Sequence, residues 1–153
     1  MKVVITIPGK PFAKKRARGF YNPRLGRAVT VNDPANARFE DVVRQHGMSA
    51  FPQPLTGPVR LTITAIFEPA ASWSKKRRAA AMGNWHVQKP DGDNLLKAVK
   101  DGLNRIAWTD DCQVSDARAV KMWGEAAATV VEIEALPLTD SQLRALIVGG
   151  GAE

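Results

Sequence analysis

Cysteine, histidine and long apolar runs are scarce in this sequence, and each shortage excludes a class of protein. The 153 residues include one cysteine, Cys112, and two histidines, His46 and His86. A single cysteine excludes a disulfide within the chain, and so few sulfur and imidazole ligands exclude a zinc site. No apolar run approaches the roughly 20 residues that cross a bilayer, and the opening residues lead directly into a strand pattern. We therefore expect a cytosolic protein.

Charged residues, by contrast, are abundant and unbalanced. Lysine and arginine number 22 and aspartate and glutamate 15, which gives a net charge of +7, while 44% of the residues are hydrophobic. This length and hydrophobic share fit one globular domain with a modest core. We expect that domain to occupy residues 1–136. Residues 137–153 are expected to form a peripheral tail with a short helix at residues 141–147 and a glycine-rich end.

Alternating apolar residues predict strands at residues 3–7, 28–31, 59–67, 114–123 and 127–135, and the last two are expected to form a hairpin through Gly124 and Glu125. A helix begins after Asp33 and Pro34, which are a favoured N-cap and first helical residue, and its expected buried face includes Val42. Together these elements predict an α+β (α/β two-layer) fold. It contains a mixed sheet of about four strands with two main helices on one face.

Residues 89–122 concentrate acid in an otherwise basic chain. Asp91 and Asp93 stand at the mouth of a helix expected at residues 93–106, and Asp110 and Asp111 precede the next strand. That helix is predicted from an apolar stripe at three- and four-residue spacing, formed by Leu95, Leu96, Val99, Leu103 and Ile106. The plainest interpretation is that Asp93 or Asn94 caps the helix, because both residue types are favoured there.

Capping accounts for one acid, whereas this segment offers four. Mg²⁺ prefers oxygen ligands and is typically held by one or a few carboxylates together with water and substrate phosphate. An Asp-x-Asp pair with a third acid from a neighbouring strand fits that requirement. Lys97 follows Asp93 by four residues, so it lies on the same side of the helix. It is either a cation that acts on phosphate or a solvated helix lysine.

Two basic clusters precede the acidic segment in the sequence. The first follows the opening strand as a loop and contains Lys14, Lys15, Arg16 and Arg18; the second lies in a short helix expected at residues 72–82 and contains Lys75, Lys76, Arg77 and Arg78. A charge run is often only a solvated surface, but basic residues interleaved with aromatic ones suit a DNA backbone and exposed bases. We expect Trp73 to pack beneath the second cluster, with stacking on a base as the alternative. We expect His86 to be a loop residue and Cys112 to be a small packing residue.

The sequence P-D-G-D-N-L-x-K-A, followed by A-W-x-D-D-x-Q-V, resembles the RusA family of Holliday junction resolvases, which occur on bacterial chromosomes and in phages and prophages. The opening GKPFAKKRAR is also similar to that family, and the resemblance covers residues 3–135. It implies a small homodimeric endonuclease that cuts branched DNA with Mg²⁺, for which Mn²⁺ substitutes. By position, Asp91 and Asp93 match the metal-binding aspartates, Lys97 the functional lysine and Asp111 the third aspartate. Gly92 departs from the aliphatic residue common between the first two aspartates.

We therefore expect a Mg²⁺-dependent endodeoxyribonuclease that resolves four-way junctions in DNA recombination and repair. A nuclease of the same fold that prefers forks or flaps is an alternative. A DNA-binding module without chemistry is another, with the acids serving only as caps. A third is an interaction subunit whose basic surface binds an acidic protein.

Overall fold

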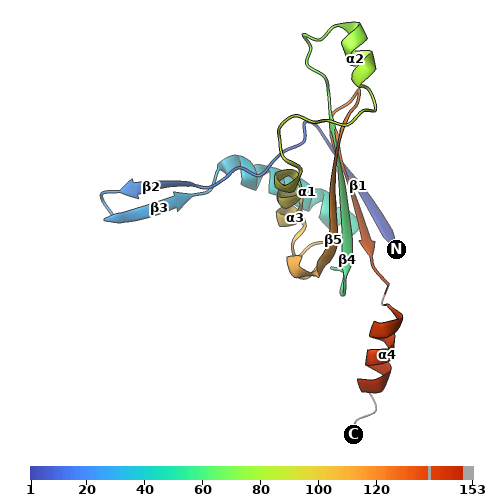
Figure 1. Cartoon of the computed structure of the whole chain (residues 1–153). Helices are drawn as coiled ribbons and strands as arrows, with labels where there is room; N and C mark the ends of the chain where they lie inside the picture. Colours follow the sequence, from blue (N-terminus) through green and yellow to red (C-terminus); the bar gives the residue numbers. More distant parts are fainter. Residues whose placement is uncertain (138, 150–153) are drawn as a thin grey trace.

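The central sheet has four strands in a mixed arrangement. In this computed structural model, which describes residues 1–137 and 139–149, the strand order is β1 (Lys2–Pro8), β6 (Ala128–Ala135), β4 (Val59–Phe67) and β5 (Val114–Trp123) (Figure 1). β6 runs antiparallel to both β1 and β4, whereas β4 and β5 are parallel. The predicted α+β fold with a mixed four-stranded sheet is confirmed.

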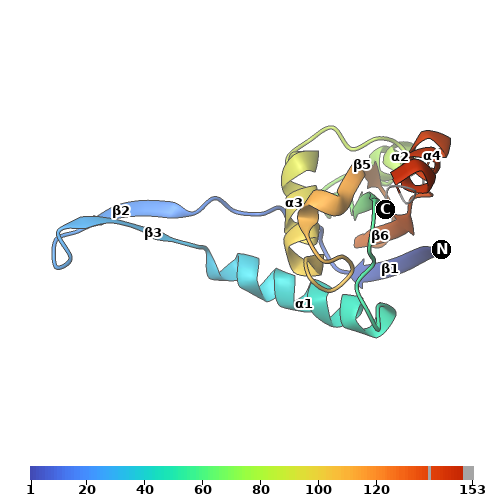
Figure 2. The same cartoon turned by 90° about the horizontal axis from the view of Figure 1, so that it is seen from below.

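Strand β4 is the centre of the core because one of its faces is completely buried. Val59, Leu61, Ile63 and Ala65 are each 0% exposed. Helix α1 (Pro34–Ala50) packs against β1 and helix α3 (Gly92–Leu103) against β5, and the two helices pack against each other (Figure 2).

The close contact between α1 and α3 depends on two helical glycines. A Cβ atom added to Gly102 would lie 2.7 Å from the Cβ of Val43, and one added to Gly47 would lie 2.8 Å from a methyl group of Leu103. Larger side chains at either glycine would therefore force the helices apart. The packing of α1 in this way fixes the position of α3, whose N-terminus carries the acidic motif.

The predicted hairpin between the last two strands is wrong, because β4 lies between β5 and β6. Their connection crosses the end of β4, where the backbone N–H of Gly124 donates to the Phe67 carbonyl at 2.9 Å and that of Ala127 donates to the Glu68 carboxylate at 3.0 Å. A central strand with a buried face must satisfy its backbone groups on both edges. The alternation pattern located each strand but carried no information about its neighbours.

Residues 10–27, predicted as a basic loop, instead include a strand. β2 (Arg18–Asn22) pairs antiparallel with β3 (Arg27–Val31), and Figures 1 and 2 show this hairpin projecting away from the sheet and helices. Two smaller predictions are also corrected. Val42, which was expected on the buried face of α1, is 41% exposed, and Cys112, which was expected to be a packing residue, is exposed.

The C-terminal segment lies outside the sheet. Helix α4 (Asp140–Gly149) contains the helix expected at residues 141–147 and stands beyond the end of β6 (Figure 1). The domain limit at residue 136 stays a prediction, and the end of the glycine-rich tail, residues 150–153, lies outside the described residues. None of the helices within residues 1–137 and 139–149 is long and apolar enough to cross a membrane.

Candidate active site and nucleic-acid interface

The N-terminus of α3 presents the Asp-x-Asp pair. Asp91 occupies the N-cap position, but its side chain makes no capping hydrogen bond, and Asp93 lies in the first turn. The prediction that Asp93 or Asn94 caps this helix is therefore wrong. Gly92 lets the helix start close to β5, because a Cβ atom there would lie 3.3 Å from the Cβ of Ala119. Both acids are exposed.

An acidic hollow of about 240 Å³ lies along α3. It is lined by Asp93, Leu96, Lys97, Lys100, Asp101 and Asp111. The structure thus brings together three of the four predicted catalytic residues, whereas Asp91 is not among the lining residues. Asp101 was not named among the predicted site residues, although its spacing from Asp93 and Lys97 was a usable signal. Asp93, Lys97 and Asp101 recur every four residues and so share one face of the helix.

The two adjacent aspartates before β5 have different roles. Asp110 caps the short 3₁₀ turn Asp111–Gln113 through a capping box, in which its carboxylate accepts from the backbone N–H of Cys112 at 3.0 Å. That hydrogen bond lowers the pKa of Asp110. Asp111 instead lines the acidic hollow, and one of its oxygens accepts from the indole N–H of the fully buried Trp108 at 2.8 Å. Trp108 therefore orients the carboxylate that faces the hollow.

A second hollow, of about 360 Å³, lies on the basic side of Lys97. We call it the basic hollow; it is lined by Lys14, Lys15, Arg16, Ala17, Asn32, Asn94 and Lys97. The backbone N–H of Lys14 donates to the Asn94 carbonyl at 3.0 Å, which joins this segment to the start of α3. Lys97 lines both hollows.

The buried Asn36 of α1 holds the basic segment in place. It is 1% exposed, its carbonyl oxygen accepts from the Lys15 backbone N–H at 2.8 Å, and its amide donates to the Lys15 carbonyl at 2.8 Å. A third bond runs from the amide to the Asn32 side chain, also at 2.8 Å. The basic residues are thereby positioned by a satisfied buried amide rather than by a flexible loop.

Lys14 is engaged within the protein. Its ammonium group forms ion pairs with Asp101 and, at 3.3 Å, with Glu40. Burial by itself lowers the pKa of Lys14. Hydrogen bonds to Asp101 and Glu40 and the negative charge of both carboxylates raise the pKa by more than burial lowers it, so the net shift is upward. Lys15, Arg16 and Arg18 are exposed. Among the four predicted DNA-binding residues of the first cluster, these three are open to solvent, although the Lys15 ammonium group also lies 3.9 Å from a carboxylate oxygen of Asp33.

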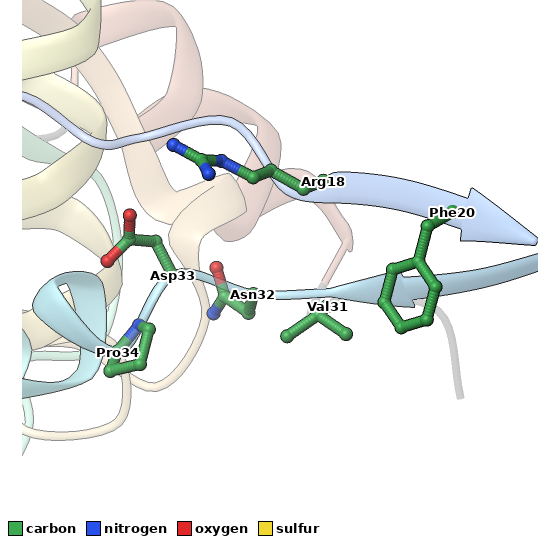
Figure 3. Close-up of a pocket in the computed structure, with 6 residues that line it drawn as sticks. All are labelled: Arg18, Phe20, Val31, Asn32, Asp33 and Pro34. Carbon is green, nitrogen blue, oxygen red and sulfur yellow. The ribbon is translucent and has the colours of Figure 1, made fainter. Parts of the chain in front are cut away.

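Residues 10–32, which we call the basic segment, contain the whole net charge of the chain. Seven of the 22 lysines and arginines and none of the 15 aspartates and glutamates lie there, so the rest of the chain has 15 of each sign. Its hairpin exposes Phe20 at 51% and Tyr21 at 66%. A hollow of about 310 Å³ lies where the hairpin meets α1, lined by Arg18 and Phe20 from β2 and by residues 31–34 (Figure 3).

The second basic cluster lies in α2 (Lys75–Ala81), which Ser74 caps by accepting from the Arg77 backbone N–H at 3.2 Å. The Arg77 guanidinium lies 3.7 Å from the centre of the Trp73 ring, and Trp73 packs against Trp123 with ring centres 4.9 Å apart. The predicted packing of Trp73 is confirmed.

The donor set of the acidic hollow suits a hydrated hard cation. No three acidic, histidine or cysteine side chains converge as metal ligands within the part of the chain that the structure describes. Asp93 and Asp111 nevertheless face one hollow from two elements. Mg²⁺ keeps several waters and is usually bound through one or two carboxylates, so these two side chains fit it, with Asp91 two residues away.

These features define a class of protein, an α+β domain that places carboxylates beside a cationic surface suited to nucleic acid. Residues 8–134 match the family model described as Endodeoxyribonuclease RusA. The chain belongs to this family, whose members are endonucleases that act on Holliday junctions. It is also 33% identical over 133 residues to the uncharacterized protein YqaN of Bacillus subtilis (strain 168), a match that covers 80% of this chain and 89% of that protein. The resemblance seen in the sequence motifs is confirmed.

Proposed function

We propose that this chain is a Mg²⁺-dependent endonuclease that resolves Holliday junctions by hydrolysing phosphodiester bonds. The observation that carries the proposal is the position of Lys97, which lines both the acidic hollow and the basic hollow. A DNA strand bound along the basic hollow brings its phosphates towards Asp93 and Asp111. Carboxylates repel phosphate unless a cation lies between them, so the arrangement supports a metal-dependent reaction.

In this proposal Asp93 and Asp111 hold the ion, with Asp91 as the third carboxylate. The chemistry that Mg²⁺ supplies when bound is polarisation of the scissile phosphate and activation of water. Lys97 contacts a phosphate oxygen and stabilises the negative charge that grows there as water attacks phosphorus and the bond to the leaving oxygen breaks. Trp108 keeps the Asp111 carboxylate turned to the hollow through its 2.8 Å hydrogen bond.

The hairpin β2–β3 supplies the main DNA contact. A two-stranded ribbon fits the major groove of a duplex, and cations neutralise phosphates without regard to sequence. Arg16 and Arg18 stand at its base and Arg24 and Arg27 near its turn, all exposed. Lys75 and Lys76 of α2 offer a second contact with the DNA backbone.

The active form is a homodimer. A four-way junction has two symmetric cleavage points, and a two-fold dimer matches that symmetry with one hollow per strand to be cut. Paired cuts in recombination and repair are the role that follows. A nuclease that prefers forks or flaps would use the same residues.

A panel of labelled DNAs tests the proposal directly. Four-way junctions, forks, flaps and linear duplexes are incubated with the protein in Mg²⁺ or in excess chelator, and the products are resolved on denaturing gels. We expect symmetric nicks in the junction with Mg²⁺ only. Binding to every branched DNA without any cleavage would instead identify a DNA-binding module without chemistry, and preferential cutting of forks or flaps would reassign the substrate.

A further inference from the structure

A fourth hollow, of about 410 Å³, lies between α2 and the segment that leads into α3. We call it the aromatic cleft. Its lining includes four aromatic side chains, Phe67, Trp73, His86 and Trp123, and three cations, Lys10, Arg77 and Lys89. None of these seven lines the acidic hollow or the basic hollow. Its volume lies within the range of about 300–1,000 Å³ that is usual for small-molecule sites.

The aromatic wall of the cleft is rigid and uncharged. The His86 ring stacks on Phe67 with centres 4.0 Å apart and meets Trp123 at 4.4 Å. His86 is 6% exposed, and burial together with the charge of Lys121 lowers its pKa. The imidazole is therefore neutral at neutral pH, and its Nδ1 atom is buried without a hydrogen-bond partner in the described part of the chain. His86 therefore supports the wall from behind, and the half-buried rings of Trp73 and Trp123 are the ones with surface left for another ring.

The rim of the cleft carries positive charge. The Arg77 guanidinium is held 3.7 Å above the Trp73 ring, so its position is set before any ligand arrives. The acid that lines the cleft, Glu68, already accepts the backbone N–H of Ala127 at 3.0 Å. Lys89 stands two residues before Asp91, and the cleft therefore opens beside the start of the acidic motif.

We propose that the aromatic cleft binds one unpaired nucleotide of the DNA substrate. The base lies against Trp73 and Trp123, which His86 supports from behind, and Arg77, Lys10 and Lys89 contact its phosphates. A base inside a duplex has both faces covered by its neighbours, whereas a base displaced at a branch point has a face to offer. This inference rests on the proposed function for the identity of the DNA, but the binding it describes needs no cleavage.

The test compares two single strands in chelator. One is a fluorescein-labelled ten-residue thymidine oligonucleotide, and the other is a ten-residue abasic strand with the same phosphates and no bases. Fluorescence anisotropy is expected to give tighter binding of the thymidine strand. Trp73→Ala should weaken binding of the thymidine strand by about 5- to 150-fold, the loss typical of one base–aromatic stack. Trp73→Phe should retain most of the affinity for this strand.

Two matched controls separate the cleft from general effects. Trp85 is 70% exposed and does not line the cleft, so Trp85→Ala should bind both strands as the parent does. Arg77→Ala lies on the exposed α2 helix, where alanine preserves folding, and should weaken binding of both strands; Arg44→Ala removes an exposed arginine of α1 and should not. Thermal melting of each variant checks that it is folded.

Equal affinity for the thymidine and abasic strands would overturn the proposal, as would a folded Trp73→Ala variant that binds thymidine normally. If Trp73→Ala does not fold, an unchanged thymidine affinity in Arg77→Ala overturns it instead. Junction cleavage measured in Mg²⁺ keeps the two proposals apart. If the protein cuts junctions but binds the thymidine and abasic strands equally, only the proposal for the aromatic cleft is overturned. If it prefers the thymidine strand but never cuts a junction, only the proposed nuclease function is overturned.

Discussion

The basic segment and the rest of the chain divide two tasks between them. The basic segment carries the whole net charge of +7 and projects a two-stranded hairpin, whereas the remainder has balanced charge and a packed core around β4. Affinity for a polyanion grows with the number of exposed cations and tolerates a loose scaffold. Chemistry needs side chains held at fixed positions, so the carboxylates lie on the packed part.

The two regions meet at α3, and their junction is specific. The Lys14 backbone donates to Asn94, and the Lys14 side chain pairs with Asp101 of the acidic hollow. Asn36 fastens Lys15 from the other side. The proposed division of labour is therefore open to experiments that alter one region and measure the task of the other.

The largest effect is expected from the carboxylates. Asp91→Asn, Asp93→Asn and Asp111→Asn should each abolish cleavage and leave junction binding unchanged or tighter, because each removes a negative charge that opposes phosphate. Cleavage on gels and binding by anisotropy in chelator check both parts.

Asp110→Asn is the matched control for the carboxylates, since asparagine also serves as an N-cap and should keep the 3₁₀ turn and most of the activity. If Asp110→Asn is inactive while Asp111→Asn cuts normally, the assignment of the two aspartates is reversed. If Asp93→Asn loses both junction binding and its thermal unfolding transition, Asp93 is needed for folding and not for metal binding.

The next effect is expected at Lys97, which borders both hollows. Lys97→Ala should reduce single-turnover cleavage at saturating protein by about 10²–10³, the range for loss of one electrostatic contact to the transition state. Junction affinity should change little. Lys100 lines only the acidic hollow, so Lys100→Ala should lose less. Normal cleavage by Lys97→Ala would leave this residue as a solvated helix lysine.

The basic segment is tested by its salt dependence. Simultaneous replacement of Lys15, Arg16 and Arg18 by alanine should make the slope of log affinity against log salt shallower by about 2.7, since each phosphate contact on duplex DNA contributes about 0.9. A control that replaces Arg38, Arg44 and Arg144, exposed arginines of α1 and α4, removes the same charge elsewhere. An equal change in both variants would mean that net charge, and not the hairpin, sets affinity.

The anchor between the two regions should contribute stability. Asn36→Ala leaves the Lys15 backbone groups without their buried partner, so the free energy of unfolding in urea should fall by about 1–3 kcal/mol. Hydrogen exchange at the Lys15 amide should accelerate while exchange in β4 keeps its rank as the slowest. Unchanged exchange at Lys15 would show that other contacts hold the segment.

The smallest effect is expected in the pH dependence of stability, and it concerns only the packed part of the chain outside the basic segment. The folded pKa of His86 is below its usual value, so the folded state binds fewer protons than the unfolded state. Its stabilising contribution is present above about pH 6.5 and is lost as the pH falls from there through the folded pKa. His86→Phe should flatten this part of the dependence of the melting temperature on pH.

Most strands and the site helix were predictable from local pattern. The alternation of β1 and β4 and the three- and four-residue spacing of α3 each report burial of one side of a single element. β2 escaped detection because Arg18 to Asn22 has no alternation, all of it but Asn22 being exposed, and its pairing with β3 defines it as a strand. The cap of α3 was displaced by two residues, to Asp91, since several adjacent residues there are acceptable caps.

The sequence by itself determined the family, the acidic motif and the concentration of charge, because these follow from residue identity and short spacing. Only the tertiary structure decided which residues meet. It placed β4 between β5 and β6, brought Asp111 and Asp101 to the same hollow, paired Lys14 internally and buried His86 between two aromatic rings. The physical reason is that such contacts join residues far apart in the chain. They form where the whole domain buries its apolar surface and satisfies its backbone groups together, and no local window contains that information.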